Sequence, residues 1–262
     1  MINPYYKTNS CQLFQCDNLE LLKQLPDNCI DLIYCDILYG TGRNFGDYQD
    51  LKPVFQTIKD HYIPRIFEMK RVLKATGKIF IHCDYHINHW MRMILDDVFG
   101  YNNFTNEIIW CYRGGGVSKR GFANKHDTIL SYEKEFKKSL YIPQFSEYSE
   151  SSKNLVNSRG GTSIDGKERD LDRGCHMNDW WTDINSLQTW SPERMDYNTQ
   201  KPVDLLKRII ESSTIENEVV ADFYMGAGTT AKAALELQRK FIGCDIGEKA
   251  CKIAKERIEK YE

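Results

Sequence analysis

The stretch that decides the fold is residues 30–42, which read IDLIYCDILYGTG. A mostly apolar, β-favouring run ends in an acid and a tyrosine, and two glycines then mark a turn. This pattern predicts a strand that delivers Asp36 and Tyr39 to the carboxyl edge of a sheet, where open α/β proteins place their chemistry. A carboxylate accepts hydrogen bonds from an amino group, and an aromatic face stacks on a planar ring. Together these side chains are suited to holding a nucleobase by its exocyclic amine.

The composition fits one large α/β domain with a small insertion. The chain has 262 residues, of which 41% are hydrophobic and 27% charged, as is ordinary for a globular protein. Its net charge is −2 and its pI is near 6.3, so a nucleic-acid partner must be met by a local basic patch. The nine cysteines form no C-x-x-C pair, and the sequence shows neither a signal-peptide pattern nor a membrane-spanning apolar run. We therefore expect a soluble, cytoplasmic protein with reduced thiols and no membrane partner.

Hydrophobic periodicity and capping signals predict alternating strands and helices. We expect strands over residues 12–16, 30–36, 78–83, 106–112, 218–222 and 241–245. We expect helices over about 18–25, 53–75, 87–98, 202–211 and 229–238, followed by a final helix. Asp17 is a candidate cap for the first helix, and Pro64 is expected to kink or split the second.

The character of the chain changes after Gly114. Between Cys111 and Leu140, seven Lys or Arg residues stand against three acids, and aromatic residues are interleaved with them. We expect four of these to contact phosphates, namely Arg113, Lys119, Arg120 and Lys125. Residues 144–178 are polar with little periodicity, which indicates a substrate-contacting insertion or, alternatively, a solvated surface excursion.

A second motif, residues 226–231 (GAGTTA), directly follows a strand and opens a helix. Its glycines permit a tight turn, and Asp245 at the tip of the next strand can bind ribose hydroxyls. A dinucleotide and S-adenosylmethionine both fit this plan. Tyr224 inside the turn, Asp222 at the strand end, and the C-terminal position of the βαβ unit favour S-adenosylmethionine. We do not expect a phosphate-binding P-loop, because no Lys-Ser or Lys-Thr follows the glycines.

These motifs, in this order, resemble those of the β-class amino-methyltransferases of DNA, and are similar to type III modification subunits and their short relatives. Residues 36–42 (DILYGTG) stand where that family has Asp-Pro-Pro-Tyr, commonly followed by Asn-Thr-Gly. Residues 222–230 (DFYMGAGTT) stand where it has Asp-Pro-Phe-x-Gly-x-Gly-Thr-Thr. Further matching segments are Cys16-Asp17, 95–100, 109–110, 199–202 (TQKP) and 241–245 (FIGCD).

The resemblance implies an α/β fold: a Rossmann-like S-adenosylmethionine-dependent methyltransferase sheet with a circularly permuted motif order and a small inserted DNA-recognition region. Residues 1–112 would form the catalytic half, 113–190 the target-recognition insertion and 191–262 the cofactor-binding half. The partner would be double-stranded DNA, and a homodimer and a cognate restriction endonuclease are further candidates.

The resemblance also implies roles for particular residues. Asp36 and the Ile37 carbonyl would accept hydrogen bonds from N6 of a flipped adenine that stacks on Tyr39, and the methyl group would pass directly in line. Leu38 completes this catalytic motif. The implied cofactor-binding residues are Asp17, Asp36, Thr199, Lys201, Asp222, Tyr224, Gly226, Gly228, Thr229 and Asp245.

One departure from the family opens alternatives. Ile37 and Leu38 replace two prolines that stiffen the turn, so activity is either retained or impaired. N4-cytosine methylation is the nearby enzyme alternative, although the leading Asp argues for adenine. A nicotinamide-dependent oxidoreductase is a more distant one. A histidine-rich segment, residues 82–89, offers metal-ligand types, but His82 and Cys83 are consecutive on a strand and point to opposite faces, so we expect no metal.

Overall fold

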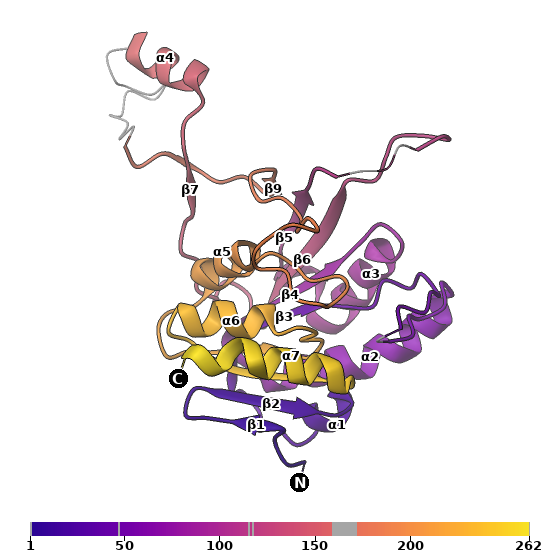
Figure 1. Cartoon of the computed structure of the whole chain (residues 1–262). Coiled ribbons are helices and arrows are strands. Elements are labelled where there is room, and N and C mark those ends of the chain that lie inside the picture. The colour runs from indigo at the N-terminus through magenta and orange to yellow at the C-terminus, as the bar shows by residue number, and fades with distance from the viewer. Residues whose placement is uncertain (1, 47, 115, 117, 159–171, 262) are drawn as a thin grey trace. The chain divides into compact units, whose positions relative to one another are not determined.

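The computed structural model describes residues 2–46, 48–114, 116, 118–158 and 172–261 (Figure 1). The chain forms two compact units. The large unit comprises Met1–Tyr141 with Asp179–Glu262, and the small unit comprises Ile142–Asn178.

The large unit is built on a mostly parallel sheet of the order β1-β2-β11-β10-β3-β4-β6-β5-β9. Strands β2, β11, β10, β3 and β4 run parallel, β6 lies antiparallel between β4 and β5, and β1 is antiparallel to β2. In chain order the bounds are β1 Tyr6–Lys7, β2 Cys11–Gln15, β3 Ile30–Asp36, β4 Leu73–Cys83, β5 Phe104–Cys111, β6 His126–Glu133, β9 Trp180–Trp181, β10 Val219–Asp222 and β11 Lys240–Asp245. The α/β fold expected from the sequence is confirmed, and its large sheet is mostly parallel.

Helices cover both faces of this sheet. Figure 1 shows α5, α6 and α7 stacked on one side, and α1, α2 and α3 form neighbouring pairs on the other. Their bounds are α1 Asn18–Leu22, α2 Phe55–Val72, α3 Asn88–Phe99, α5 Val203–Ser213, α6 Thr229–Glu236 and α7 Glu248–Ile258, with short 3-10 turns η1 Tyr101–Asn103 and η2 Glu259–Tyr261. Because helices flank it on both sides, β3 is buried from Ile30 to Cys35.

Strand β6 is the main element that the sequence did not predict. Residues 126–133 were expected to lie within the inserted region 113–190, whereas they form an interior strand of the sheet between β4 and β5. The acidic residues Asp127 and Glu133 near its two ends make this segment look solvent-exposed in the sequence. In the structure both are almost fully buried. Asp127 is paired with His82, and Glu133 accepts backbone hydrogen bonds from Lys137 and Ser139. Such polar residues are compatible with burial only because these partners satisfy their hydrogen bonds.

Helix α2 runs through Pro64 as one helix, so the expected split does not occur. The proline removes one donor from the carbonyl of Asp60, four residues earlier, and Asp60 is exposed to water. The buried face, formed by Ile58, Tyr62, Ile66 and Met69, keeps the helix packed on either side of the proline.

The small unit contains regular structure where the sequence showed little periodicity. Strands β7 (Phe145–Ser146) and β8 (Cys175–His176) pair antiparallel, and α4 spans Glu150–Ser158. The ring of Phe145 lies 4.7 Å from that of His176, and the Arg173 guanidinium lies 4.4 Å from the Phe145 centroid.

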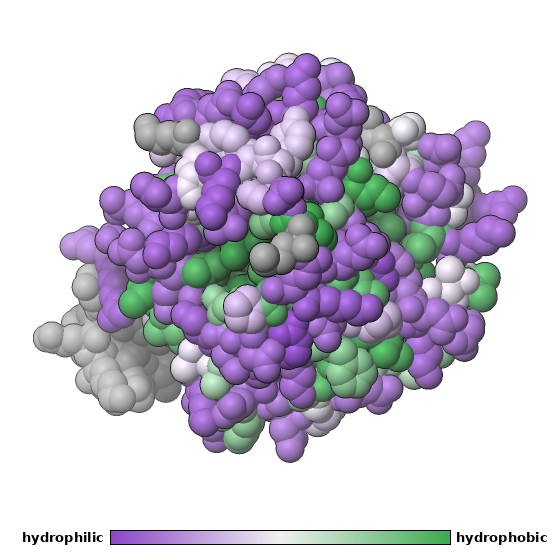
Figure 2. Space-filling view, turned by 90° about the horizontal axis from the view of Figure 1, so that it is seen from below, coloured by the Kyte–Doolittle hydropathy of each residue, from purple (hydrophilic) through white to green (hydrophobic). Residues whose placement is uncertain are grey.

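Figure 2 shows one face dominated by polar residues, with hydrophobic surface gathered around a hollow near its middle. Among the described residues, no helix is both long and apolar enough to span a membrane.

Candidate active site

A cavity of about 410 Å³ opens at the carboxyl edge of the parallel strands. Three neighbouring strands, β3, β10 and β11, each end in an aspartate, and all three carboxylates line this cavity: Asp36, Asp222 and Asp245. The volume lies in the range of small-molecule sites. The site is therefore assembled where α/β sheets usually bind their ligands.

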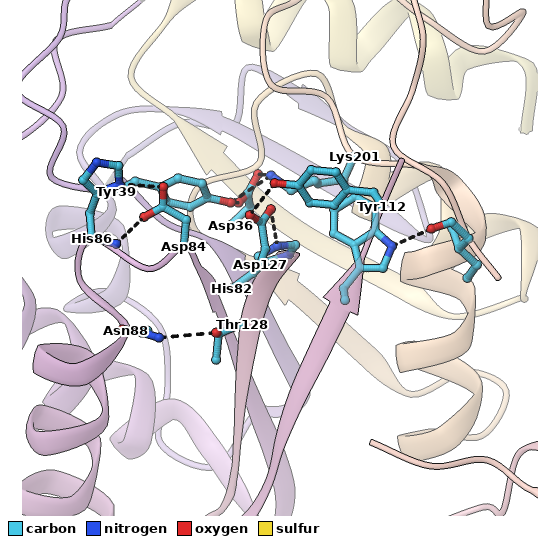
Figure 3. A network of polar contacts seen from close by, with 12 residues as sticks. Asp36, Tyr39, His82, Asp84, His86, Asn88, Tyr112, Asp127, Thr128 and Lys201 are labelled. Carbon is cyan, nitrogen blue, oxygen red and sulfur yellow. Dashed lines mark hydrogen bonds and ion pairs between the residues drawn. The ribbon is translucent and has the colours of Figure 1, made fainter. Parts of the chain in front are cut away.

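Asp36 lies at the centre of a short polar network (Figure 3). The Tyr39 hydroxyl donates to Asp36 Oδ1 at 2.6 Å, and Lys201 Nζ donates to Asp36 Oδ2 at 2.6 Å. Lys201 also lies 3.0 Å from the Tyr39 hydroxyl oxygen and 5.3 Å from the ring centroid. Burial raises the pKa of the Tyr39 hydroxyl well above its usual value, and Asp36 raises it further, so this hydroxyl stays a donor. The carboxylate and the aromatic ring that the sequence singled out are thus held together.

The turn after Asp36 is fixed by tertiary hydrogen bonds. The backbone N–H of Ile37 donates to the carbonyl of His82 at 3.2 Å, and the Tyr62 hydroxyl donates to the carbonyl of Leu38 at 2.8 Å. The turn adopts its backbone path without the family's prolines. These contacts replace some of the stiffness that two proline rings would supply.

Asp50 anchors the loop that follows. Its carboxylate accepts hydrogen bonds from the backbone N–H groups of Gly40, Thr41 and Leu51, at 2.7–3.0 Å, and from the Thr41 hydroxyl. Asp50 itself is buried. One carboxylate therefore fastens both ends of the loop that borders the cavity.

The glycine turn between β10 and α6 has the geometry expected of a ligand cradle. Gly226 and Gly228 adopt φ values of +48° and +71°, which favour glycine. The N–H of Gly226 donates to Asp245 Oδ2 at 3.0 Å. A Cβ on Gly228 would lie 2.8 Å from that of Ala254 in α7, so only glycine fits between the turn and this helix.

Asp222 lies beneath this turn and is fully buried. Its carboxyl accepts from the N–H of Tyr224 at 2.9 Å and from the Thr230 hydroxyl at 2.5 Å. Burial raises the pKa of Asp222 to about 7, because these hydrogen bonds only partly offset the loss of water. Asp222 is therefore a group that changes its charge near neutral pH.

Besides the end of β3 and the glycine turn, residues at the start of α1 and on α2 also line the cavity. Asp17 caps α1 by accepting from the N–H of Leu19 at 2.8 Å, as the sequence predicted, and it forms an ion pair with Arg65 at 2.7 Å. Arg65 Nε donates to Asn18, whose amide donates in turn to the carbonyl of Phe223 beside the glycine turn. This chain of contacts ties the α1 end of the cavity to the glycine turn.

Tyr224 joins the glycine turn to α2. Its hydroxyl is 3.1 Å from His61 Nε2. Burial, aided by the neighbouring charge of Arg65, lowers the pKa of His61 to about 4, so this imidazole is neutral at physiological pH.

Most of the predicted site residues line this one cavity. They are Asp17, Asp36, Ile37, Leu38, Tyr39, Thr199, Lys201, Asp222, Tyr224, Gly226, Thr229 and Asp245. Gly228 is instead turned against Ala254. Of the predicted DNA-contacting residues, Arg113, Lys119 and Arg120 are exposed and Lys125 is partly buried, all in the loop between β5 and β6 and none against the cavity.

Several cavity residues were not predicted from the sequence. They are Asn18, Tyr48, Asp50, His61, Arg65 and Tyr197. The i, i+4 spacing of His61 and Arg65 places two polar residues on one face of α2, and this is the one pattern that would have indicated them. Asn18, by contrast, contacts Phe223, which lies 205 positions away in the chain.

The histidine-rich segment at the end of β4 is occupied by protein contacts. His82 lies between Tyr34 and Asp127, and His86 Nδ1 lies 2.7 Å from Asp84. Within the described part of the chain, no group of three or more His, Cys, Asp or Glu side chains is placed to hold a metal ion.

Comparison with known proteins places this chain in a family. Residues 30–256 match the family model described as DNA methylase, of the N6/N4 methyltransferases. The chain belongs to this family. The match includes the strand β3 that bears Asp36, the glycine turn and most of α7.

Named relatives are similar over nearly the whole chain. Type II methyltransferase M.BamHI of Bacillus amyloliquefaciens is 30% identical over 98% of this chain, which spans only 59% of that protein. Type II methyltransferase M2.LlaDCHI of Lactococcus lactis subsp. cremoris is 30% identical, covering 99% of this chain and 93% of the relative. DNA adenine methyltransferase YhdJ of Escherichia coli is 28% identical over 93% of this chain and 81% of its own length. Two of these three relatives are named type II methyltransferases, whereas the sequence motifs resemble those of type III modification subunits.

Solved structures share the fold. PvuII DNA methyltransferase (cytosine-N4-specific) aligns with a TM-score of 0.68 at 15% identity, covering 98% of this chain and 89% of that one. The M1.HpyAVI–SAM complex aligns with a TM-score of 0.61 at 21% identity, covering 94% and 99%.

Proposed function

We propose that this DNA methylase transfers a methyl group from S-adenosylmethionine to N6 of an adenine flipped out of double-stranded DNA. The observation that carries the proposal is the shared cavity. Asp36 and Tyr39, suited to holding an amine-bearing base, face the same space as the glycine turn of Gly226.

The cavity residues fit S-adenosylmethionine. The positive φ of Gly226 opens the turn for close approach, and the carboxylates of Asp36 and Asp245 face the space where a cationic ligand would lie. Asp17, Thr199, Lys201, Tyr224 and Thr229 complete its walls, while Asp222 and Gly228 hold the turn in place. S-adenosylmethionine, when bound, supplies an electrophilic methyl group on a sulfonium.

Asp36 then acts on the acceptor amine. Its carboxylate and the Ile37 carbonyl accept hydrogen bonds from N6 and orient the nitrogen lone pair. The negative charge of Asp36 stabilises the positive charge that develops on N6, and positioning is the larger contribution. Tyr39 supplies the stacking surface, and Leu38 completes the turn with its carbonyl held by Tyr62.

We propose adenine rather than cytosine as the target base for two reasons. The base motif begins with Asp36, where cytosine-specific enzymes more often have Ser, and the relative YhdJ is named a DNA adenine methyltransferase. Transfer to N4 of cytosine is the alternative product that the experiment below distinguishes.

The DNA backbone is proposed to lie along the loop between β5 and β6. Arg113, Lys119, Arg120 and Lys125 supply positive charge there on a protein whose net charge is −2. We propose that residues 142–178 also belong to the target-recognition part of the chain, outside the permuted catalytic and cofactor halves. The type II names of the relatives support a role in restriction-modification, with a cognate endonuclease as partner. A homodimer stays a prediction.

The test is transfer of tritiated methyl groups from S-adenosylmethionine to unmethylated genomic DNA, followed by hydrolysis to nucleosides. Label in N6-methyladenine is expected. Label in N4-methylcytosine would keep the fold and the mechanism but overturn the base. No label, with cofactor binding shown by calorimetry, would contradict the proposed activity.

A further inference from the structure

A buried polar pair lies directly behind Tyr39, and the proposed reaction does not use it. His82, the last but one residue of β4, has no exposed surface, and Asp127 near the start of β6 is 6% exposed. Their side chains meet at 3.1 Å, Nε2 to Oδ2 (Figure 3). Neither residue lines the cavity.

Hydrogen bonds from both neighbouring strands fix the imidazole of His82. Its Nδ1 lies 2.7 Å from the Tyr34 hydroxyl on β3, and its Nε2 faces Asp127 on β6. A carboxylate only accepts, so Nε2 carries the hydrogen that bonds to Asp127, and the Tyr34 hydroxyl is the hydrogen-bond partner of Nδ1. The indole of Trp110 on β5 meets the imidazole edge-on, with ring centroids 5.6 Å apart.

Asp127 is itself anchored. Its second oxygen, Oδ1, accepts from the Tyr112 hydroxyl at 3.0 Å. Although burial raises its pKa, the hydrogen bond and charge interaction with His82 and the charge of Lys201 outweigh this effect and hold the pKa of Asp127 below its ordinary value. It is therefore a fixed acceptor.

The held imidazole supports the ring of Tyr39. The two rings are stacked, with centroids 6.5 Å apart and planes inclined by 27°. The hydroxyl end of Tyr39 is fixed separately by Asp36. Tyr39 is thus restrained at two points, its hydroxyl by the catalytic motif and its ring plane by His82.

We propose that Asp127, acting through His82, positions the ring of Tyr39 for stacking on the target base. This inference rests on the proposed function. A buried polar pair is costly, and well-packed apolar side chains of similar size would serve the sheet at least as well. The polar pair instead gives one defined imidazole orientation beside the ring that must receive the base.

The test is a double-mutant cycle between Asp127→Ala and Tyr39→Ala, measured by methyl transfer to genomic DNA. Asp127→Ala is expected to lower kcat about 10- to 100-fold by misplacing the Tyr39 ring, while the cofactor dissociation constant stays within about threefold. In the Tyr39→Ala background, Asp127→Ala is expected to have no further effect on the rate.

A conservative variant separates positioning from folding. In Asp127→Asn, the amide oxygen can still accept from His82 and the NH₂ can donate to the Tyr112 hydroxyl oxygen, so kcat is expected to stay within about threefold of wild type. If Asp127→Ala fails to fold, Tyr34→Phe removes only the hydroxyl on His82 Nδ1 and takes its place in the cycle. Thermal unfolding of each variant reports its folding.

The outcomes are distinct. If Asp127→Ala lowers the rate by the same factor with and without Tyr39, the inference is overturned. It is also overturned if cofactor affinity falls as far as the rate. Either result leaves the proposed function intact. A wild-type enzyme without transfer activity would overturn both. A rate loss confined to backgrounds that retain Tyr39 supports the inference.

Discussion

Lys201 Nζ lies 2.6 Å from Asp36 Oδ2, although the two residues are 165 positions apart in the sequence. Both side chains are largely buried, at 11% and 19% exposure. The lysine was assigned from its motif to the cofactor, yet its ammonium is bonded to the carboxylate and tyrosine of the base motif. The segment before α5 is therefore joined to the end of β3.

Replacing this lysine should affect both stability and catalysis. Lys201→Met removes the ammonium that pairs with Asp36, so we expect a loss of about 1–3 kcal/mol in the free energy of unfolding. Methyl transfer should fall about 10- to 100-fold because the carboxylate loses its fixed orientation. Lys207→Met is the matched control. Lys207 forms an ion pair with Glu236, with 2.7 Å between Nζ and Oε2, and Lys207 does not line the cavity. Equal transfer rates in the two variants would contradict the role of Lys201.

The Ile37-Leu38 turn makes an asymmetric prediction for prolines. Ile37→Pro removes the N–H that bonds to the carbonyl of His82 and should cost about 1–3 kcal/mol. Leu38→Pro keeps the carbonyl that accepts from Tyr62, so it should be close to neutral. Urea denaturation measures both free energies, and methyl transfer is followed in parallel. A stabilising Ile37→Pro would show that the His82 contact contributes little.

Asp222 predicts a pH dependence of stability. Its pKa is raised from 3.8 to about 7, so between these values the folded state binds more protons than the unfolded state. The contribution of Asp222 to the free energy of unfolding is therefore fully present below pH 4 and declines as the pH rises toward 7. Asp222→Asn keeps a similar shape without this titration.

Urea denaturation of wild type and Asp222→Asn from pH 4.5 to 7.5 isolates the effect. As the pH rises, the free energy of unfolding of wild type should fall relative to that of Asp222→Asn by a few kcal/mol. The expected slope is about 1.4 kcal/mol per pH unit between the two pKa values. A difference that stays constant with pH would mean that the carboxyl is already ionised in the folded protein.

Gly228 should be intolerant of a side chain. In Gly228→Ala, a Cβ at φ +71° would meet Ala254 at 2.8 Å, so we expect a loss of about 1–3 kcal/mol and weaker cofactor binding as the turn shifts. Gly121→Ala is the control, because nothing lies within 4 Å of its added Cβ. Calorimetry measures the cofactor affinity of both variants, and urea denaturation measures their free energies of unfolding. Equal values for Gly228→Ala and Gly121→Ala would contradict the tight contact between the turn and α7.

The elements with strong local patterns were predictable. The buried run of β3, the cap at Asp17 and the strand–turn–helix at residues 219–236 follow from hydrophobicity, side-chain capping and glycine spacing. Strand β6 was not predicted because its polar Asp127 and Glu133 are satisfied by partners outside the strand.

The site was predictable as motifs but not as a network. Asp36, Tyr39 and Asp245 were identified from their positions at strand ends, and they do line one cavity. The pairing of Lys201 with Asp36 depends on how segments far apart in the chain meet. Local sequence carries no signal for such contacts.

Transfer by Asp36→Ala, compared with wild type under saturating cofactor and DNA, tests the central claim most directly. We predict a loss of at least about 1,000-fold in the rate of tritiated-methyl transfer to adenine, since both the orientation of the amine and the stabilisation of its charge depend on this carboxylate. Cofactor binding should remain measurable by calorimetry, because the glycine turn and Asp245 are retained. Undiminished turnover in Asp36→Ala would contradict the account.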